Sequence, residues 1–184
     1  MPANRQTVSQ RPGPALHRSA LDLIEHEHRM QEHLCDILEK IADCLPHEVD
    51  PQLCRKAVQA LRHDIPLHHR DEELGLFPLL NKYAGNMPVI KMAIQRLETE
   101  HDSDEGFAGE LIEQLENLAQ GGRSGNANML GYMLRGFFEG YRRHIHWEDA
   151  VIMPLARQHL SADDLITLEK VMLHNRAEAV GYHD

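Results

Sequence analysis

Apolar residues recur at alternating steps of three and four over most of the chain, which is the spacing of residues on one face of an α-helix. A first helix is predicted to begin between Pro14 and Leu21 and to end near Cys44, with an apolar stripe of Leu21, Ile24, Cys35, Leu38, Ala42 and Leu45. A longer stripe predicts another helix from about Met87 to about Gln120, with Ile90, Ile94, Leu97, Ala108, Leu111, Leu115 and Leu118 on one face. No segment shows the strict alternation of a β-strand, so the pattern predicts an all-α chain.

Prolines and glycines divide the remaining sequence into two further long helices. Pro51 is suited to the first turn of a helix, and the helical pattern continues from there to about Tyr83. Pro66 lies inside this stretch, where its ring predicts a kink or a short break. The glycine-rich segment GGRSGN ends the third helix, and a fourth is predicted to run from about residue 125 to residue 159.

A short fifth helix is predicted near the end of the chain. Ser161 is a suitable N-cap, Asp164 completes a pattern like a capping box, and the helix continues to about Ala179. Four long helices joined by short loops predict an antiparallel up-down-up-down four-helix bundle, with the fifth helix packed across one end. Residues 1–13 carry no apolar periodicity and are expected to form a disordered leader, which leaves 14–184 as one domain.

Two eleven-residue segments in the second and fourth helices follow one pattern. Residues 68–78 read HHRDEELGLFP and residues 144–154 read HIHWEDAVIMP, with a histidine first, acids at +4 and +5, apolar residues at +8 and +9, and proline at +10. The first and third helices share a weaker pattern, EHRMQEHL at 27–34 and EHDSDEGF at 100–107. The chain is therefore predicted to contain an internal repeat of one helix hairpin.

This repeat places one histidine of each long helix at a similar height. With a rise of about 1.5 Å per residue, His68 and His144 each lie roughly 22 Å from the end of their helix, and His101 lies roughly 20 Å from the start of its own. His28 and His101 continue the apolar stripes of their helices, so their rings are expected to face the core. The sequence thus predicts four imidazoles in one buried layer.

Two carboxylates are predicted to join the layer. Glu72 and Glu148 each follow one of these histidines by four residues, which puts both side chains of each pair on one helix face. Buried carboxylates and imidazoles are costly without a partner, and a pair of divalent cations bridged by the two carboxylates would compensate them. Mixed imidazole and carboxylate ligands favour iron, manganese or zinc over calcium or magnesium. The 14 histidines among 184 residues agree with a metal-binding function.

Some neighbouring residues compete for these positions. His26 lies two residues before His28 but off the apolar stripe. His69 has the same spacing to a following acid as His68, and the distance to Pro78, repeated in the fourth helix, favours His68. His69 therefore remains a candidate for an additional ligand or for a contact outside the ligand layer.

Three more side chains next to the predicted ligands are expected to lie outside the layer. Glu73 and Asp149 come directly after the two predicted carboxylate ligands and are expected to face away or to make outer contacts. His146 has Ala150 rather than an acid four residues later, so it is expected to be exposed or to contact a ligand from outside.

The doubled histidine-acid-proline segments, preceded by the Glu-His segments, resemble the hemerythrin-like, or HHE cation-binding, domain over roughly residues 15–180. The resemblance implies a four-helix bundle that holds a non-haem di-iron centre with an oxo or hydroxo bridge. Carried onto this sequence, it implies a ligand set of His28, His68, Glu72, His101, His144 and Glu148. Other divalent metals remain compatible with these residues.

The chain departs from the oxygen-carrying members of that family at one position. Those proteins have a second histidine four residues after the ligand on the third helix, where this chain has Glu105. Glu32 is the matching residue of the first helix. Both are candidates for a further ligand, a proton relay or a rim residue. A carboxylate ligand would stabilise ferric iron and weaken reversible oxygen binding, so the sequence argues against simple oxygen transport.

The expected function is that of a non-haem di-iron protein that binds or reacts with oxygen, peroxide or nitric oxide, in sensing, scavenging or iron handling. Its partners would be a small diatomic or peroxo ligand and an electron donor that the sequence does not identify. The alternative is a non-catalytic metal-binding or metal-storage module. Whether the protein is an enzyme, and whether it forms a homo-oligomer, stay open at this stage.

Charge and cysteine content narrow the choice of partner and compartment. The formal net charge is −10, and no Lys/Arg cluster of the kind that follows phosphates is present, so nucleic acid and anionic membranes are not expected partners. No apolar stretch approaches the roughly 20 residues of a membrane helix. Three cysteines without a CxxC spacing suggest free thiols in a reducing compartment, and a cytoplasmic location is expected.

Overall fold

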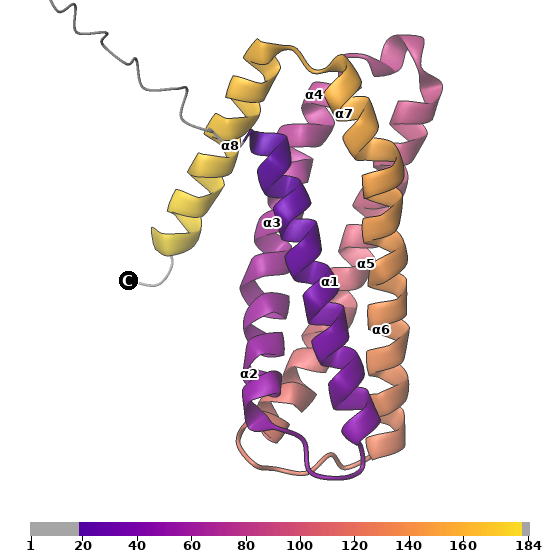
Figure 1. Ribbon diagram of the computed structural model, residues 1–184, viewed down its shortest axis with the longest axis vertical. Helices are drawn as coiled ribbons and strands as arrows, with labels where there is room; N and C mark the ends of the chain where they lie inside the picture. Colours follow the sequence, from indigo (N-terminus) through magenta and orange to yellow (C-terminus); the bar gives the residue numbers. More distant parts are fainter. Residues whose placement is uncertain (1–18, 182–184) are drawn as a thin grey trace, which may run out of the picture.

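Every regular element in residues 19–181, the part of the chain that the computed structural model describes, is helical (Figure 1). The prediction of an all-α fold is confirmed, whereas the expected leader over 1–13 lies outside the described residues. The elements, including three π-helical turns and one 3-10 turn labelled η, are α1 (Ala20–Cys44), α2 (Pro51–Gln59), η1 (Ala60–Asp64), α3 (Ile65–Asp71), η2 (Glu72–Leu76), α4 (Phe77–Asn81), η3 (Ala84–Asn86), α5 (Pro88–Ala119), α6 (Ala127–Trp147), η4 (Glu148–Ile152), α7 (Met153–His159) and α8 (Ala162–Gly181).

Four long helical runs lie side by side along the molecule. They are α1, the continuous run from α2 to α4, α5, and the run from α6 to α7 (Figure 1). In the view of Figure 1, α1 runs downward, the run from α2 upward, α5 downward and the run from α6 upward. α1 packs against α2 and α6, and α5 packs against α2 and α6. Each run therefore has two neighbours, and the space among the four is the core.

The first helix begins with a complete capping box. The Ser19 hydroxyl accepts a hydrogen bond from the backbone N–H of Asp22 at 3.2 Å, and the Asp22 carboxylate accepts one from the backbone N–H of Ser19 at 3.0 Å. Such a cap satisfies otherwise unpaired backbone groups and stabilises a helix by about 1 kcal/mol. It fixes the start of α1 within the window that the sequence predicted.

Each of three prolines inside a long run follows a π-helical turn. Pro66, Pro78 and Pro154 come after η1, η2 and η4, and in each case the N–H of the preceding residue bonds to the carbonyl five residues earlier. A proline ring clashes with the carbonyl four residues before it, and a wider turn relieves that clash. The helix therefore continues through Pro66 without the break that the sequence analysis allowed.

Two apolar clusters fill the core, one above the other. The lower cluster in the view of Figure 1 includes Leu38 of α1, Leu111 of α5 and Phe137 of α6. The upper cluster includes Ile24 of α1 and Ile94 of α5. On every long run the buried histidines and glutamates lie between the residues of the two clusters. The polar layer is therefore enclosed by apolar packing at both ends.

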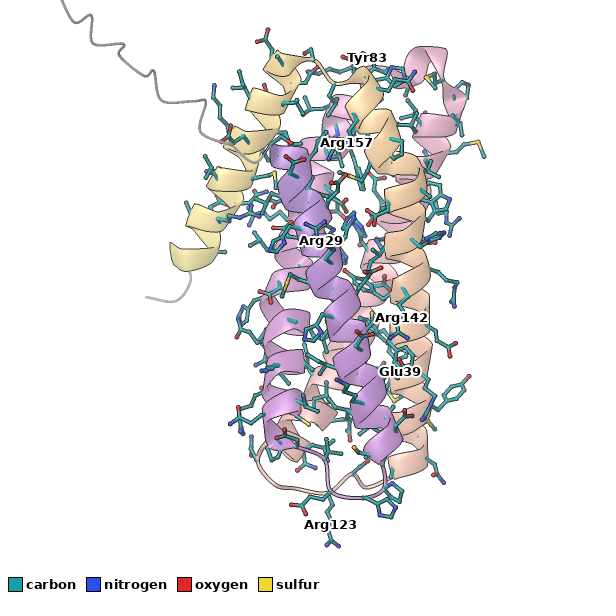
Figure 2. All side chains as sticks on the ribbon, in the orientation of Figure 1. Arg29, Glu39, Tyr83, Arg123, Arg142 and Arg157 are labelled. Atoms are coloured by element: carbon teal, nitrogen blue, oxygen red, sulfur yellow. The ribbon has the colours of Figure 1, made fainter. Side chains whose placement is uncertain are left out.

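Arginines on the outside hold α1 against the run from α6 to α7. Arg142 donates to Asp36 and Glu39 of α1 at 2.7 and 2.8 Å, and Figure 2 shows Arg142 and Glu39 next to each other. Nearer the top, Arg157 donates to Asp22 at 2.9 Å (Figure 2). These pairs are partly or largely exposed and each contributes little stability, but together they are consistent with one register of the two runs.

The fifth helix, α8, has nearly the predicted bounds but a different position. It has 20 residues and runs along the side of the molecule against α1, α3 and η2 (Figure 1), rather than across one end. Leu168 and Met172 bury their side chains in the upper apolar cluster. Gly75 of η2 permits this approach, because a Cβ atom there would lie 2.7 Å from Leu168 Cδ1. The sequence pattern showed where this helix begins and ends but not the surface that it covers.

Asp164 at the start of α8 provides a test of how this helix is held. Its carboxylate accepts hydrogen bonds from Lys82, from Ser161 and from the Tyr83 hydroxyl (labelled in Figure 2), which hold its pKa well below the usual value. An unfolded aspartate has a pKa of about 3.9. Its stabilising contribution is therefore present above about pH 4 and is lost as the pH falls below that value toward the lowered pKa of the folded state.

We expect Asp164→Asn to lower the melting temperature at pH 7, with a difference from the wild type that shrinks between about pH 4 and pH 2. Circular dichroism melts across this range measure it. Asp163→Asn, at the exposed neighbouring position, should show almost no difference at any pH. A deficit for Asp164→Asn that stays constant with pH would show that packing, not the charge, holds the start of α8.

Candidate metal centre

Seven titratable side chains from all four long runs meet in the polar layer between the apolar clusters. Each is at most 3% exposed. α1 supplies His28, α3 supplies His68 and His69, α5 supplies His101, and α6 supplies His144, while Glu72 and Glu148 are the first residues of η2 and η4. All six residues of the predicted ligand set are therefore brought together, and His69 joins them.

The side chains form two adjacent groups that could each hold a metal ion. In the first, which we call site A, His28 and His68 lie with Glu72 and Glu148, with one potential ligand atom of each residue within 4.8 Å of the others. In the second, site B, the same holds for His69, His101 and His144. The two sites are contiguous, because Glu72 and Glu148 of site A lie 3.4 Å from His101 Nε2 and 3.1 Å from His144 Nε2 of site B, respectively.

The two carboxylates lie between the sites. Glu72 Oε2 is 3.6 Å from His68 Nε2 of site A and 3.4 Å from His101 Nε2 of site B. Glu148 contacts His28 Nε2 at 3.3 Å and His144 Nε2 at 3.1 Å. Each carboxylate therefore reaches the rings of both sites, which is the position that a bridging ligand requires.

Buried polar atoms without hydrogen bonds converge on this point. The Nε2 atoms of four rings and all four oxygens of the two carboxylates are buried and lack a hydrogen-bond partner; they belong to His28, His68, His101, His144, Glu72 and Glu148. Unpaired buried polar atoms are rare and costly. Imidazole nitrogens and carboxylate oxygens are suitable ligands for iron, manganese or zinc. A pair of such ions would satisfy these atoms together.

Two of the three π-helical turns, η2 and η4, begin at one of the two carboxylates. Glu72 begins η2 and Glu148 begins η4, each one helical turn after a histidine of the layer. π-Helical turns occur often at functional sites. In this chain the proline at +10 of the repeated segment explains why the wide turn is found at the same place twice.

Each of the five rings is fixed from outside by a second carboxylate. The Nδ1 atoms lie within hydrogen-bond distance of one carboxylate each: His28 to Asp149 at 2.6 Å, His68 to Glu27 at 3.1 Å, His69 to Glu105 at 3.2 Å, His101 to Glu73 at 2.8 Å and His144 to Glu100 at 3.0 Å. A carboxylate can only accept, so each Nδ1–H donates. This leaves the Nε2 lone pair facing the layer, as in many metal sites.

These outer contacts explain the acids of the repeated motif. Glu27 and Glu100 directly precede histidines of the layer, yet each bonds the ring of the following run, His68 and His144 respectively. Conversely, Glu73 of the second run bonds the His101 ring of the third run, and Asp149 of the fourth run bonds the His28 ring of the first. The sequence analysis allowed outer contacts for Glu73 and Asp149. It did not assign Glu27 and Glu100, although the doubled Glu-His pair was the available signal.

His69 breaks the symmetry of the layer. The matching position of the repeat is Ile145, an apolar core residue. The His69 ring stacks on His101 with centroids 3.8 Å apart and an interplanar angle of 6°, and its Nε2 atom lies 3.3 Å from the hydroxyl of the buried Tyr141. Site B therefore has three rings and site A has two. The sequence analysis ranked His69 below His68, whereas the structure gives each of them a place.

Glu105 lies at the rim of the layer, which is one of the three positions that the sequence analysis left open for it. Its side chain is 50% exposed and contacts the His69 ring from outside, so it belongs to neither group. The inference that a carboxylate ligand here would stabilise ferric iron therefore loses its basis, because an imidazole from the neighbouring helix fills the layer instead. Glu32 and His146 are exposed and also lie outside both groups.

Electrostatics divide the rings into two kinds. Burial opposes a charge on His101 and His144, but close contact with the buried carboxylates raises their pKa values to about 11 and about 9. The same contacts outweigh the burial of Glu148 and hold its pKa well below the usual value. Burial dominates at the two neighbouring rings of α3 and lowers the pKa of His68 to about 3 and that of His69 to about 4. A cation would take the place of the protons on His101 and His144.

The fold and this layer define the class of protein as a helical cation-binding domain. Residues 19–156 match the hemerythrin HHE cation-binding domain, and the chain belongs to that family. An uncharacterized protein of Haemophilus influenzae is 36% identical over 111 residues, which is 60% of this chain and 60% of that protein. The chain thus spans less than two thirds of this relative. No solved structure matches the chain.

Two further findings bear on the setting of the domain. The matched range ends before α8, so this helix lies outside the part of the chain that the family describes. Within residues 19–181, no helix combines the length and the hydropathy that a membrane span needs.

Proposed function

We propose that the protein binds two iron ions in the layer and that the pair binds or reacts with oxygen, peroxide or nitric oxide. The observation that carries this proposal is the convergence of eight buried, unpaired nitrogen and oxygen atoms from four helices. His28 and His68 would hold one ion, His69, His101 and His144 the other, and Glu72 and Glu148 would be shared. Bound iron supplies redox chemistry and Lewis acidity toward a small ligand.

The unequal number of rings supports an open position at site A. Site A offers two imidazoles and site B three, while Glu72 and Glu148 each lie within 3.6 Å of a ring nitrogen in both sites. The ion with fewer protein ligands is the one that can accept a small molecule. The protein residues then act as a rigid frame, because each of the five rings is held on its outer side by a carboxylate.

The surroundings of the layer restrict what can enter. Apolar clusters enclose the layer above and below, which favours small, uncharged or weakly charged ligands. Tyr141 is buried at the edge of site B, and burial together with the nearby carboxylates raises its pKa well above 10. Its hydroxyl therefore stays protonated and can donate a hydrogen bond inside the layer.

The reciprocal outer contacts also support our interpretation of the fold as an antiparallel up-down-up-down bundle made of two helix hairpins of one design. Glu27 bonds His68 as Glu100 bonds His144, and Asp149 bonds His28 as Glu73 bonds His101.

An electron donor is proposed because iron that reacts with oxygen must be reduced again. The three unpaired cysteines agree with a reducing, cytoplasmic location.

Metal content and the optical response of the reduced protein test this function. We expect about two iron ions per chain and near-ultraviolet absorption from a bridged diferric pair with imidazole ligands. The dithionite-reduced protein should change its spectrum within seconds of exposure to oxygen or nitric oxide. Zinc-loaded protein, which has no such absorption, is the matched control.

The alternative is a non-catalytic metal-binding or metal-storage module, which the rigid and enclosed ligand frame would also suit. Iron that loads at about two per chain, but whose reduced form responds to neither gas, would establish that alternative. A chain that binds no iron would overturn both.

A further inference from the structure

A continuous series of polar contacts joins α8 to site A. The carboxylate of Asp71 on α3 is fully buried and accepts hydrogen bonds from Asn175 at 2.9 Å and from Arg176 Nη1 at 2.6 Å. The other terminal nitrogen of Arg176 donates to Glu27 Oε1 at 2.5 Å. Glu27 Oε2 in turn accepts from His68 Nδ1 at 3.1 Å. Four side chains thus connect the fifth helix to a ring of the metal layer.

The geometry fixes each member of this series. Arg176 also donates to the carbonyl of Met172 at 2.8 Å, so its guanidinium is held by α8 itself, by Asp71 and by Glu27. Glu27 uses one oxygen for Arg176 and the other for His68. A carboxylate bound at both oxygens has little freedom to rotate, and it therefore fixes the plane of the ring that it bonds.

Glu27 differs from the four other outer carboxylates. Its side chain is 22% exposed, whereas those of Glu100, Glu73, Asp149 and Glu105 are 32% to 50% exposed. Its counterpart in the repeat, Glu100, is paired with Arg96 on its own helix, and that arginine is 52% exposed. Among the five outer carboxylates, Glu27, the partner of His68, is therefore the least exposed. It is also the one held by α8, which lies outside the residues that match the family, 19–156.

We propose that Arg176 is a positioning residue for site A, which makes α8 a part of the metal centre. It holds the Glu27 carboxylate in place, and Glu27 orients the His68 imidazole toward the metal position. The proposal rests on the function proposed above and concerns the site with fewer rings, where the loss of one well-oriented ring matters most. By linkage, a metal ion in site A also stabilises the docking of α8.

The expected effect is confined to one of the two metal ions. Without Arg176, Glu27 is a half-buried carboxylate without its cation, and it turns toward solvent and releases His68. Loss of a partner outside the ligand layer typically lowers metal affinity by about 10- to 100-fold. We expect about a 10-fold loss at site A after Arg176→Gln and an unchanged affinity at site B, whose rings have other outer partners.

The experiment is a titration of the metal-free, full-length protein with Co²⁺, whose visible absorption reports occupied sites. It follows the filling of site A and of site B as two binding steps. The matched control is Arg70→Gln, because the partly exposed Arg70 also joins α3 to α8, but through Glu178 rather than through Glu27. Arg70→Gln should titrate as the wild type does. His68→Ala identifies the step that belongs to site A, and Arg176→Lys should restore part of the affinity.

A double-substitution cycle separates positioning from simple helix docking. If Arg176 acts through Glu27, then Arg176→Gln combined with Glu27→Gln should bind Co²⁺ no more weakly than Glu27→Gln alone. Additive losses, equal losses at both sites, or an equal loss in Arg70→Gln would overturn the proposal. So would wild-type affinity in Arg176→Gln. A wild type that does not bind two ions would instead overturn the proposed function itself.

Discussion

Removal of the metal ions should lower the melting temperature by about 10 to 20 °C. An ion present at 100 times its dissociation constant stabilises the folded state by about 2.7 kcal/mol, and two ions would contribute about 5 kcal/mol. For a domain of this size, 1 kcal/mol corresponds to roughly 2 to 4 °C. Without metal, Glu72 and Glu148 stay buried among rings of which only some carry a proton. Protons alone therefore cannot satisfy all the buried nitrogen and oxygen atoms of the layer.

Differential scanning calorimetry before and after dialysis against a chelator measures this effect, with metal loss confirmed by elemental analysis. His146→Ala is the matched control, because this exposed histidine lies outside both groups and the variant should lose as much stability on chelation as the wild type. A variant with both Glu72→Gln and Glu148→Gln should be almost insensitive to chelation. A melting temperature that does not move after proven metal loss would place the ions on the surface and reject the buried site.

Replacement of His69 by leucine should reduce the metal content from about two ions per chain to about one. His69 is one of three rings in site B, stacks on His101 and has its Nε2 atom 3.3 Å from the buried Tyr141 hydroxyl, on the side opposite the Nδ1 contact with Glu105. Loss of a direct ligand should exceed the roughly 100-fold effect of losing an outer partner. Leucine fills a similar volume, so the apolar packing around Tyr141 is kept as far as a single substitution allows.

Elemental analysis and Co²⁺ titration measure the loss, and the spectrum of the remaining ion shows which site keeps it. His146→Leu, which makes the same exchange at an exposed position of α6, should retain about two ions. His68→Leu should lose the ion of the other site. Two fully bound ions in His69→Leu would show that the ring serves only as a hydrogen-bond partner of Tyr141 and Glu105.

Several features could be predicted from local sequence because their causes are local. The alternation of apolar residues determines which face of each helix is buried, and it placed His28 and His101 inward. Glu72 and Glu148 follow a histidine by one helical turn, so their shared face is a property of the helix alone. The capping boxes at Ser19 and Ser161 each join two residues that are three positions apart, and they mark where helices begin.

Other features depend on which helices become neighbours, and the sequence pattern does not contain that information. His68 and His69 are adjacent on one helix, and spacing alone favoured one of them. Only the packing of the run from α2 to α4 between α1 and α5 shows that one ring joins site A and the other joins site B. The same packing moves Glu105 to the outside, since the His69 ring from the neighbouring helix stacks on His101 and Glu105 can contact that ring only at its outer nitrogen.

The outer carboxylates and α8 show the same division. The sequence by itself determined that acids accompany the histidines and that a helix begins after Ser161. Only the tertiary structure decided that Glu27 bonds a ring on another helix and that Arg176, 149 residues further along the chain, holds Glu27 in place. Helix periodicity acts over one turn of one segment, whereas these bonds depend on the register between segments. That register is set by the packing of apolar side chains across the whole core.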